Sequence, residues 1–267
     1  MKSFVCALAF LAAGTAAPAA VFDCVMDPAV VVSVGSPVTG LLEEVVIDRG
    51  QQVAKGDVIA RLHAEMEDAA IRLMELQAAN EDEIAVNQVR LDLAKRRQAR
   101  VGELSSRGVA TEEQFDEVNA TVGVAARELA LAQIRRDVLA LELERARTAR
   151  DQKIVRSPIN GLVIDRPMYD GEFVTQESHI ATIAQLDPLY VEAYLPVSMY
   201  PQIARGQTAT VRPNAPVGGA YEAQVVVVDQ VFDAASGTFG VRLALPNPGS
   251  VLPAGHRCTV VLGADDG

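Results

Sequence analysis

The side chains that could bind a metal ion or carry out catalysis are few and scattered in this chain. The histidines His63, His179 and His256 are far apart in the sequence, and none has the spacing of a zinc site. The run 63–68 could attract a metal ion, but its acidic residues also suit the start of a helix, where the dipole favours negative charge. No nucleophile elbow, phosphate-binding loop or Cys-x-x-Cys pair occurs. The sequence therefore predicts a protein that is not an enzyme and holds no metal or cofactor.

The cysteines suggest another chemistry, disulfide formation. Cys6 lies in a stretch typical of a secretory signal, in which a lysine is followed by apolar residues 4–13 and then by small residues. We expect a signal peptide over residues 1–20, whose cleavage leaves Cys24 and Cys258; no lipobox precedes Cys24. In an oxidising compartment a bridge between these two would stabilise the fold by roughly 4–5 kcal/mol in the chain-entropy model. The alternative is two free thiols that are buried as small apolar side chains.

An internal repeat indicates which elements position these residues. One copy begins at Ser36 as Ser-Pro-Val-Thr-Gly-Leu, and the other begins at Ser157 as Ser-Pro-Ile-Asn-Gly-Leu. Each copy consists of short β-type runs punctuated by Gly and Pro, and neither is large enough to bury a core alone. We therefore expect residues 36–63 and 154–184 to close into one small β-sandwich. A chance likeness of two β-hairpins is the alternative, and the register sustained along both copies argues against it.

Between the copies the apolar period changes from two to about 3.6, which predicts two helices of roughly 40 residues, each about 60 Å long. Asn80 and Asn87 interrupt the first stripe, and as buried polar residues they would cost stability but fix the helix register. Neither helix contains proline. The stripes run over 64–104 and 111–151 and consist of Leu73, Ile84, Leu91, Ala94 and Val101, then Val118, Val122, Ala125, Leu129, Ala132, Leu139, Leu143 and Ala146.

The connection between the helices has the signals of a tight turn. Gly108 suits the end of the first helix, and Thr111 opens a capping box with Gln114 at the start of the second. Because the two β repeats that flank the helices must pair, the start of the first helix and the end of the second helix must both lie at the β-sandwich. The sequence thus favours an antiparallel hairpin formed by residues 64–153, and an ordinary helical bundle is the alternative. The outer faces of the hairpin are expected to be polar and to pack loosely against neighbouring copies.

The rest of the chain and its composition narrow the class of protein. Residues 185–267 form a series of short β-type runs separated by Gly and Pro, which predicts a compact barrel. The chain contains only 4% aromatic residues and no Trp, which disfavours one thick globular core. A net charge of −11 argues against binding to nucleic acid. No apolar run reaches the ~20 residues of a membrane-spanning helix.

The order of half-repeat, helical hairpin, half-repeat and barrel resembles the periplasmic adaptors, or membrane fusion proteins, of the HlyD/RND efflux family. The two Ser-Pro-x-x-Gly starts match the halves of that family's biotinyl/lipoyl-like domain. The family's barrel signature is similar to Asp233-Ala-Ala-Ser-Gly-Thr-Phe-Gly-Val-Arg242, Pro246-Asn247 and Leu252-Pro253-Ala254-Gly255. The resemblance implies an elongated, multidomain α+β protein. Its parts are a strand segment at 21–35, a lipoyl-like sandwich at 36–63 plus 154–184, a coiled-coil hairpin at 64–153 and a barrel at 185–267.

The resemblance also implies partners and a docking site. In adaptors that bind TolC-type outer-membrane channels, an arginine, a leucine and a serine at fixed spacing at the hairpin tip contact the channel. Here that spacing falls on Arg100, Leu104 and Thr111, with Thr in place of Ser. The implied function is to link an inner-membrane transporter of RND or ABC type to such a channel. The implied assembly is a trimer or hexamer, in the periplasm of a Gram-negative bacterium.

The chain departs from the family in one respect. Most members return after the barrel to a membrane-proximal domain, whereas only Ala264 to Gly267 follow the last predicted strand here. This domain is expected to be missing or reduced to a fragment near 25–34. A disulfide between Cys24 and Cys258 would then link the first ordered strand to the last strand of the barrel. Two other functions stay open. One is a biotin- or lipoyl-type carrier subunit of an enzyme, and the other is an envelope scaffold without a transporter.

Overall fold

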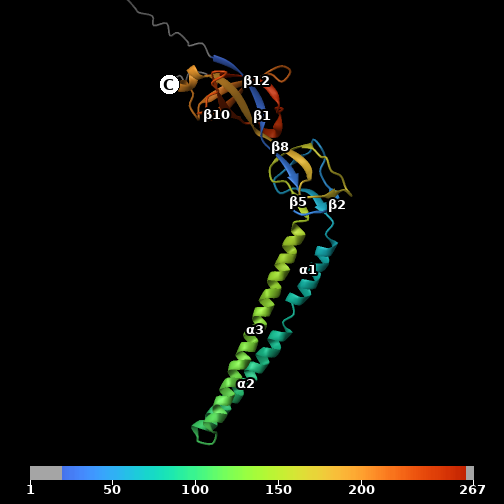
Figure 1. The fold of residues 1–267 in the computed structure, drawn as a ribbon, viewed down its shortest axis with the longest axis vertical. Coiled ribbons are helices and arrows are strands. Elements are labelled where there is room, and N and C mark those ends of the chain that lie inside the picture. The colour runs from blue at the N-terminus through green and yellow to red at the C-terminus, as the bar shows by residue number, and fades with distance from the viewer. Residues whose placement is uncertain (1–19, 263–267) are drawn as a thin grey trace, which may run out of the picture.

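The computed structural model describes residues 20–262, which form three parts arranged along one axis (Figure 1). A β-barrel lies at one end, a smaller module of two sheets in the middle and a long helical hairpin at the other end. All of the predicted signal peptide except Ala20 lies outside the described residues, as do the last five residues, 263–267. Among the residues described, no helix is both long enough and apolar enough to cross a lipid bilayer.

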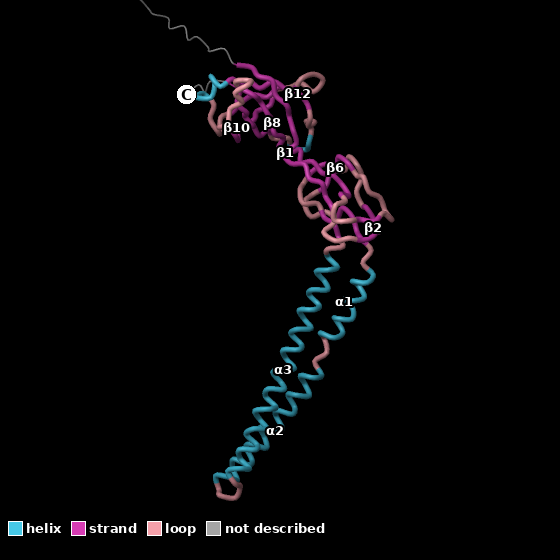
Figure 2. Tube along the Cα trace, viewed as in Figure 1, coloured by secondary structure: helices cyan, strands magenta, loops and turns pink. Residues whose placement is uncertain are grey.

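The hairpin consists of α1 (Glu65–Ala78), α2 (Asp82–Ser106) and α3 (Glu112–Asp151), with α3 antiparallel to the other two (Figure 2). The prediction of one continuous helix over 64–104 is wrong, because the chain leaves the helix between α1 and α2. Asn80 explains the break: its Oδ1 accepts a hydrogen bond of 2.9 Å from the backbone N–H of Asp82, the first residue of α2. Asparagine favours such local bonds to the backbone over a helix interior. The prediction that Asn80 is buried is also wrong, since its side chain is exposed.

The half of the hairpin near the tip has an apolar seam. Leu91 and Ala94 of α2 pack with Ala125 and Leu129 of α3, and all four are buried. Asn87 is buried as predicted, but its Nδ2 donates to the carbonyl of Glu83 in its own helix. Polar contacts between α2 and α3 come instead from other residues: Glu83 forms an ion pair with Arg135, and Nε2 of Gln98 donates a hydrogen bond to Oδ1 of Asn119 at 2.7 Å. Since these contacts require one alignment of α2 and α3, they favour the observed register.

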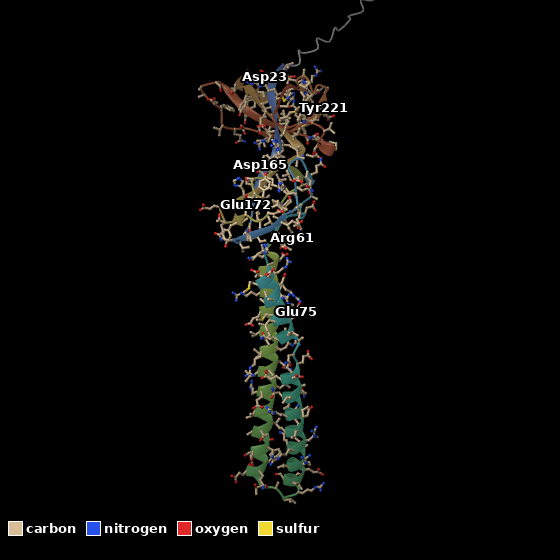
Figure 3. All side chains as sticks on the ribbon, turned by 90° about the vertical axis from the view of Figure 1, so that its right-hand side faces the viewer. Asp23, Arg61, Glu75, Asp165, Glu172 and Tyr221 are labelled. Atoms are coloured by element: carbon tan, nitrogen blue, oxygen red, sulfur yellow. A yellow bond between two sulfur atoms is a disulfide. The ribbon has the colours of Figure 1, made fainter. Side chains whose placement is uncertain are left out.

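The half of the hairpin near the middle module is held differently. No residue of α1 is buried, and Leu73, predicted in the apolar stripe, is 52% exposed. Three ion pairs connect α1 to α3 and the residues after it, in the stretch of the rod where Figure 3 labels Glu75. They are Glu75–Arg147 at 2.8 Å, Asp68–Arg150 at 3.1 Å and Glu67–Lys153 at 3.2 Å.

The middle module is built from both copies of the repeat. One sheet has the order β5 (Ile154–Arg156), β4 (Val58–Leu62), β2 (Gly40–Val45) and β7 (Phe173–Val174). The other contains β3 (Gln52–Val53), β6 (Gly161–Asp165) and parts of β8 (His179–Pro196) and β1 (Ala20–Gly35). Their shared core includes Leu42 and Ile59 from the first copy and Val163 and Ile180 from the second. The two copies are therefore parts of one folding unit.

The starts of the two copies adopt the same local structure. The hydroxyl of Ser36 donates to the carbonyl of Val38 at 2.6 Å, and that of Ser157 donates to the carbonyl of Ile159 at 2.6 Å. Both serines are buried. Because each buried hydroxyl is satisfied within its own turn, the repeated Ser-Pro motif can begin a strand inside the module without leaving a polar group unpaired.

The barrel has six strands in the order β1, β12 (His256–Leu262), β9 (Thr208–Pro213), β10 (Tyr221–Val228), β11 (Thr238–Leu245) and β8, and pairing of β1 with β8 closes it. Short 3₁₀ helices lie at Val197–Gln202 and Pro248–Ser250. The core is continuous and includes Leu189, Val211, Phe239 and Leu243. Residues 25–34 lie within β1 and pair with β8 and β12, so they form part of the barrel and the module and not a separate domain remnant.

Two strands connect the barrel to the module. β1 pairs with β12 from Ala20 to Met26 and with β8 from Cys24 to Gly35. β8 pairs with β11 in the barrel and with β6 in the module, so it passes the predicted boundary at 184–185 without interruption. No flexible linker separates the two parts, because the same two strands belong to both.

Candidate functional site at the hairpin tip

The turn between α2 and α3 is compact and fixed by backbone bonds. The N–H of Gly108 donates to the carbonyl of Ser105, and the N–H of Val109 donates to that of Leu104, both at 2.9 Å. Gly108 has a φ of 74°, a left-handed conformation that favours glycine. The backbone of the turn therefore has one defined conformation, which sets the positions from which the side chains of the tip project.

The start of α3 shows the predicted capping box. The hydroxyl of Thr111 accepts a hydrogen bond from the N–H of Gln114 at 3.2 Å, and Oε1 of Gln114 accepts one from the N–H of Thr111 at 3.1 Å. Glu112 and Glu113 follow in the first turn, where the helix dipole favours them. The hydroxyl oxygen of Thr111 thus caps the N-terminus of α3.

The other two predicted residues present an apolar and a cationic group. Leu104 lies in the last turn of α2 and is 43% exposed. Arg100 lies one turn earlier, is exposed, and has no ion-pair partner among residues 20–262. Arg107, by contrast, pairs with Glu103 at 2.5 Å. The structure therefore brings a cation without a partner and an exposed leucine onto the last two turns of α2, with Thr111 across the turn at the start of α3.

The structure adds residues at the tip that the sequence analysis did not identify. Val109 is 71% exposed on the turn beside Leu104 and enlarges the apolar surface of the tip. Phe115 of α3 packs so closely on Gly102 of α2 that a Cβ atom there would lie 3.1 Å from the ring. The sequence signal for Val109 was an apolar residue next to a turn glycine, whereas the Phe115–Gly102 contact depends on the helix register.

The cysteines lie far from the tip, in the barrel. Cys24 of β1 and Cys258 of β12 are directly opposite in the strand register, their Cα atoms are 4.9 Å apart, and their sulfur atoms are bonded in the structure. Both are buried. Across the described part of the chain, no three His, Cys, Asp or Glu side chains gather closely enough to hold a metal ion.

Two side chains in the barrel have shifted pKa values. The hydroxyl of Ser236 and the backbone N–H of Ala235 donate to Asp233, which lowers the pKa of that carboxyl. Glu192 accepts a hydrogen bond from Nε of Arg242 and, through its charge, raises the pKa of the guanidinium further. Both shifts follow from local pairing, in a turn for Asp233 and between strands for Arg242.

The molecule is thus elongated, with a barrel at one end, a sandwich-like module in the middle and a protruding hairpin at the other end. A family model described as CzcB-like, barrel-sandwich hybrid domain matches residues 30–185, and one described as CusB-like, beta-barrel domain matches residues 188–266. The chain therefore belongs to the membrane fusion protein family, the adaptors of efflux systems. This confirms the resemblance seen in the sequence.

Solved structures of related fold agree with this assignment. MacA from Actinobacillus actinomycetemcomitans is 21% identical with a TM-score of 0.76, and the match covers 92% of this chain and 78% of MacA. The membrane fusion protein Spr0693 from Streptococcus pneumoniae R6 is 13% identical with a TM-score of 0.57, and the match covers 91% of this chain and 98% of Spr0693. At these identities the likeness concerns the fold.

Proposed function

We propose that this protein is a periplasmic adaptor that links an inner-membrane transporter, of RND or ABC type, to a TolC-type outer-membrane channel through its hairpin tip. The observation that carries the proposal is the surface of the tip, where exposed Leu104 and Val109 adjoin Arg100, a cation without a partner in the described structure. This surface suits a protein contact, because arginine is among the residues that most often carry binding energy at interfaces, and neighbouring contacts help by excluding water.

The other parts of the molecule have supporting roles in this proposal. We interpret the middle module as a lipoyl-like sandwich whose usual turn is replaced by the hairpin, and the α2–α3 half of the hairpin as a coiled coil. The barrel and the module face the transporter. Several copies, three or six, surround a conduit in the periplasm of a Gram-negative bacterium, and small toxic compounds are the expected cargo.

The test is a charge reversal at the tip. We expect Arg100→Asp to weaken docking by roughly tenfold or more, since interface arginines commonly contribute over 1 kcal/mol. Export should fall while the fold, measured by circular dichroism, stays unchanged. The matched control is Arg145→Asp, an equal charge change at an exposed position of α3 near the middle module, which should leave export intact.

Crosslinking probes in cells test the contact directly. Photoreactive side chains at Leu104 and Thr111 should capture the channel protein, whereas one at Arg145 should not. If the tip probes capture no channel, or if Arg100→Asp exports normally, the docking assignment is wrong. An envelope scaffold without a transporter partner would then be the better description.

A further inference from the structure

The part of β1 that continues from the barrel into the middle module has one uncovered side (Figure 1). In the barrel, β12 pairs with β1 up to Met26. From Pro28 to Gly35, β1 pairs with β8 alone, and among the residues described no backbone hydrogen bond reaches its other side. We call this side of residues 28–35 the free edge. Unpaired N–H and C=O groups along a strand are able to bind a further strand.

The free edge lacks the features that usually protect the edge of a sheet. Apart from Pro28 at its start, it consists of small and β-branched residues and contains no charge. Sheet edges are commonly kept short or charged, and the other outer strands of the module, β3, β5 and β7, have only two or three residues. Val30 and Val31 are 41% and 53% exposed, whereas Val34 is buried in the core of the module. A valine-rich edge of this length favours aggregation unless another strand covers it.

A hollow on the outside of the barrel adjoins the start of the free edge, because Asp27, which lines it, directly precedes Pro28 in β1. Its volume is about 540 Å³, and the residues around it include Asp23, Asp27, Glu192, Tyr194 and Arg257. Glu192 already forms an ion pair within the barrel, but neither Asp23 nor Asp27 has one with any residue in the range 20–262. The ring of Tyr194 is 70% exposed and can contact a cation through its face. The hollow therefore favours a basic side chain.

The charges at the hollow indicate what covers the free edge. Only an extended chain presents N–H and C=O groups at the spacing of a strand. If two free edges of this chain paired antiparallel, the hollow of each copy would meet the uncharged residues 36–40 of the other. If they paired parallel, Asp27 would meet Asp27, and like charges directly opposite each other are unfavourable. Neither arrangement brings a basic residue to the hollow, so the better occupant is a segment of a different protein.

We infer that the free edge and the hollow form one docking site for an extended segment of a partner protein. Small or β-branched apolar residues of that segment pair with residues 28–35 through backbone hydrogen bonds, and an adjoining Lys or Arg enters the hollow beside Asp23 and Asp27. Main-chain bonds supply affinity in strand addition, and side-chain sites next to the strand supply specificity. This site goes beyond the proposed function, because it lies at the junction of barrel and module and does not involve the tip.

Binding of a synthetic peptide to the purified full chain tests the site. The probe is an eight-residue peptide that alternates valine and threonine and carries a lysine at each end. When it binds, hydrogen exchange should slow roughly tenfold or more at alternate amides of residues 28–35, because every second N–H group of a strand points to the same side. The same peptide with N-methyl groups on its backbone keeps the side chains but lacks the donors, and it should give no protection.

Matched variants of the protein test the two halves of the site. Val31→Lys should weaken peptide binding roughly tenfold or more, since a charge on a sheet edge opposes strand addition. Val21→Lys is the control, because Val21 is also exposed but lies where β12 covers the same side of β1. Asp27→Asn should reduce the preference for this peptide over one with glutamate at both ends, whereas Asp116→Asn, the same charge change on the hairpin, should not.

Three results would overturn the inference: equal protection by the N-methylated peptide, unchanged binding in Val31→Lys, or protection of residues 28–35 that rises with protein concentration when no peptide is present. The last result would show that a second copy covers the free edge. Circular dichroism checks that each variant is folded. The site and the tip are tested separately, because Arg100→Asp should bind the peptide like the wild type and a Leu104 probe should still capture the channel in Val31→Lys.

Discussion

Thr111 illustrates how one side chain at the tip can serve the fold and a partner together. Its hydroxyl oxygen already accepts the bond from Gln114, so a channel could use only the remaining lone pair or the hydroxyl hydrogen. Replacement of this residue therefore tests the helix start first. Any effect on docking has to be separated from an effect on the cap.

We expect Thr111→Ala to lower the free energy of unfolding of the tip by about 1 kcal/mol, because an N-cap bond is lost. Hydrogen exchange of the amides at 112–114 measures the change. Thr111→Ser should retain most of the protection. Thr121→Ala is the matched control: that hydroxyl bonds to the carbonyl of Glu117 within α3, where alanine is the better helix former. Unchanged exchange in Thr111→Ala would show that the cap contributes nothing.

For single residues, the sequence predicted the features that depend on near neighbours in the chain. The capping box and the turn glycine Gly108 could be identified because both depend on neighbours within four residues. The apolar contribution of Val109 and the packing of Phe115 on Gly102 could not, since they depend on how α2 and α3 align across the turn. Arg100, Leu104 and Thr111 were found through the family resemblance, and their docking role stays a prediction.

The three helices of the hairpin differ in what holds them. α2 and α3 share buried apolar residues, whereas α1 is held to α3 by ion pairs among partly exposed side chains. Exposed ion pairs contribute only about 0–1 kcal/mol each and are screened by salt. The base of the hairpin should thus be its less stable half.

This difference predicts a selective effect of salt. Raising the ionic strength should speed hydrogen exchange in α1 by several-fold, while exchange around Leu91 in α2 stays nearly constant because apolar packing is not screened. Glu75→Gln removes one ion pair and should raise exchange in α1 at low salt and weaken its salt dependence. Equal salt effects on α1 and α2 would contradict this account.

The elements themselves were predicted to different degrees. The apolar period showed two antiparallel helical arms, but not the break between α1 and α2, because Asn80 fits a buried heptad position and a helix start equally well. The length of β1 and β8 could not be predicted, since their partners are far away in the sequence.

At the scale of the whole molecule, the bond between Cys24 and Cys258 joins residues 234 positions apart. The closed loop contains the middle module, the hairpin and nearly all of the barrel. A bridge acts mainly on the unfolded chain, where it restricts a loop of this length. Its position between β1 and β12 also connects the first and last strands of the described chain.

We expect Cys24→Ala combined with Cys258→Ala to lower the free energy of unfolding of the barrel by up to about 5 kcal/mol in the chain-entropy model. Denaturant unfolding of the oxidised protein measures it. Wild-type protein in reductant is the control and should behave like the double variant. Intact mass with a thiol label checks the bridge itself: two free thiols in protein isolated from cells without reductant would refute it.

The strands β1 and β8 have a mechanical consequence. Tension that draws the hairpin away from the barrel is carried along two covalent chains, whose pairing with each other shifts register between Pro28 and Val30. For the parts to separate, β1 would have to slide along β12 and β8 along β11, and the hydrogen bonds of an antiparallel pair lie across that direction and must break together. The disulfide between Cys24 and Cys258 covalently joins β1 to β12, so these two strands cannot slide past each other while it is intact. The barrel and the module should therefore resist being pulled apart along the axis of the molecule.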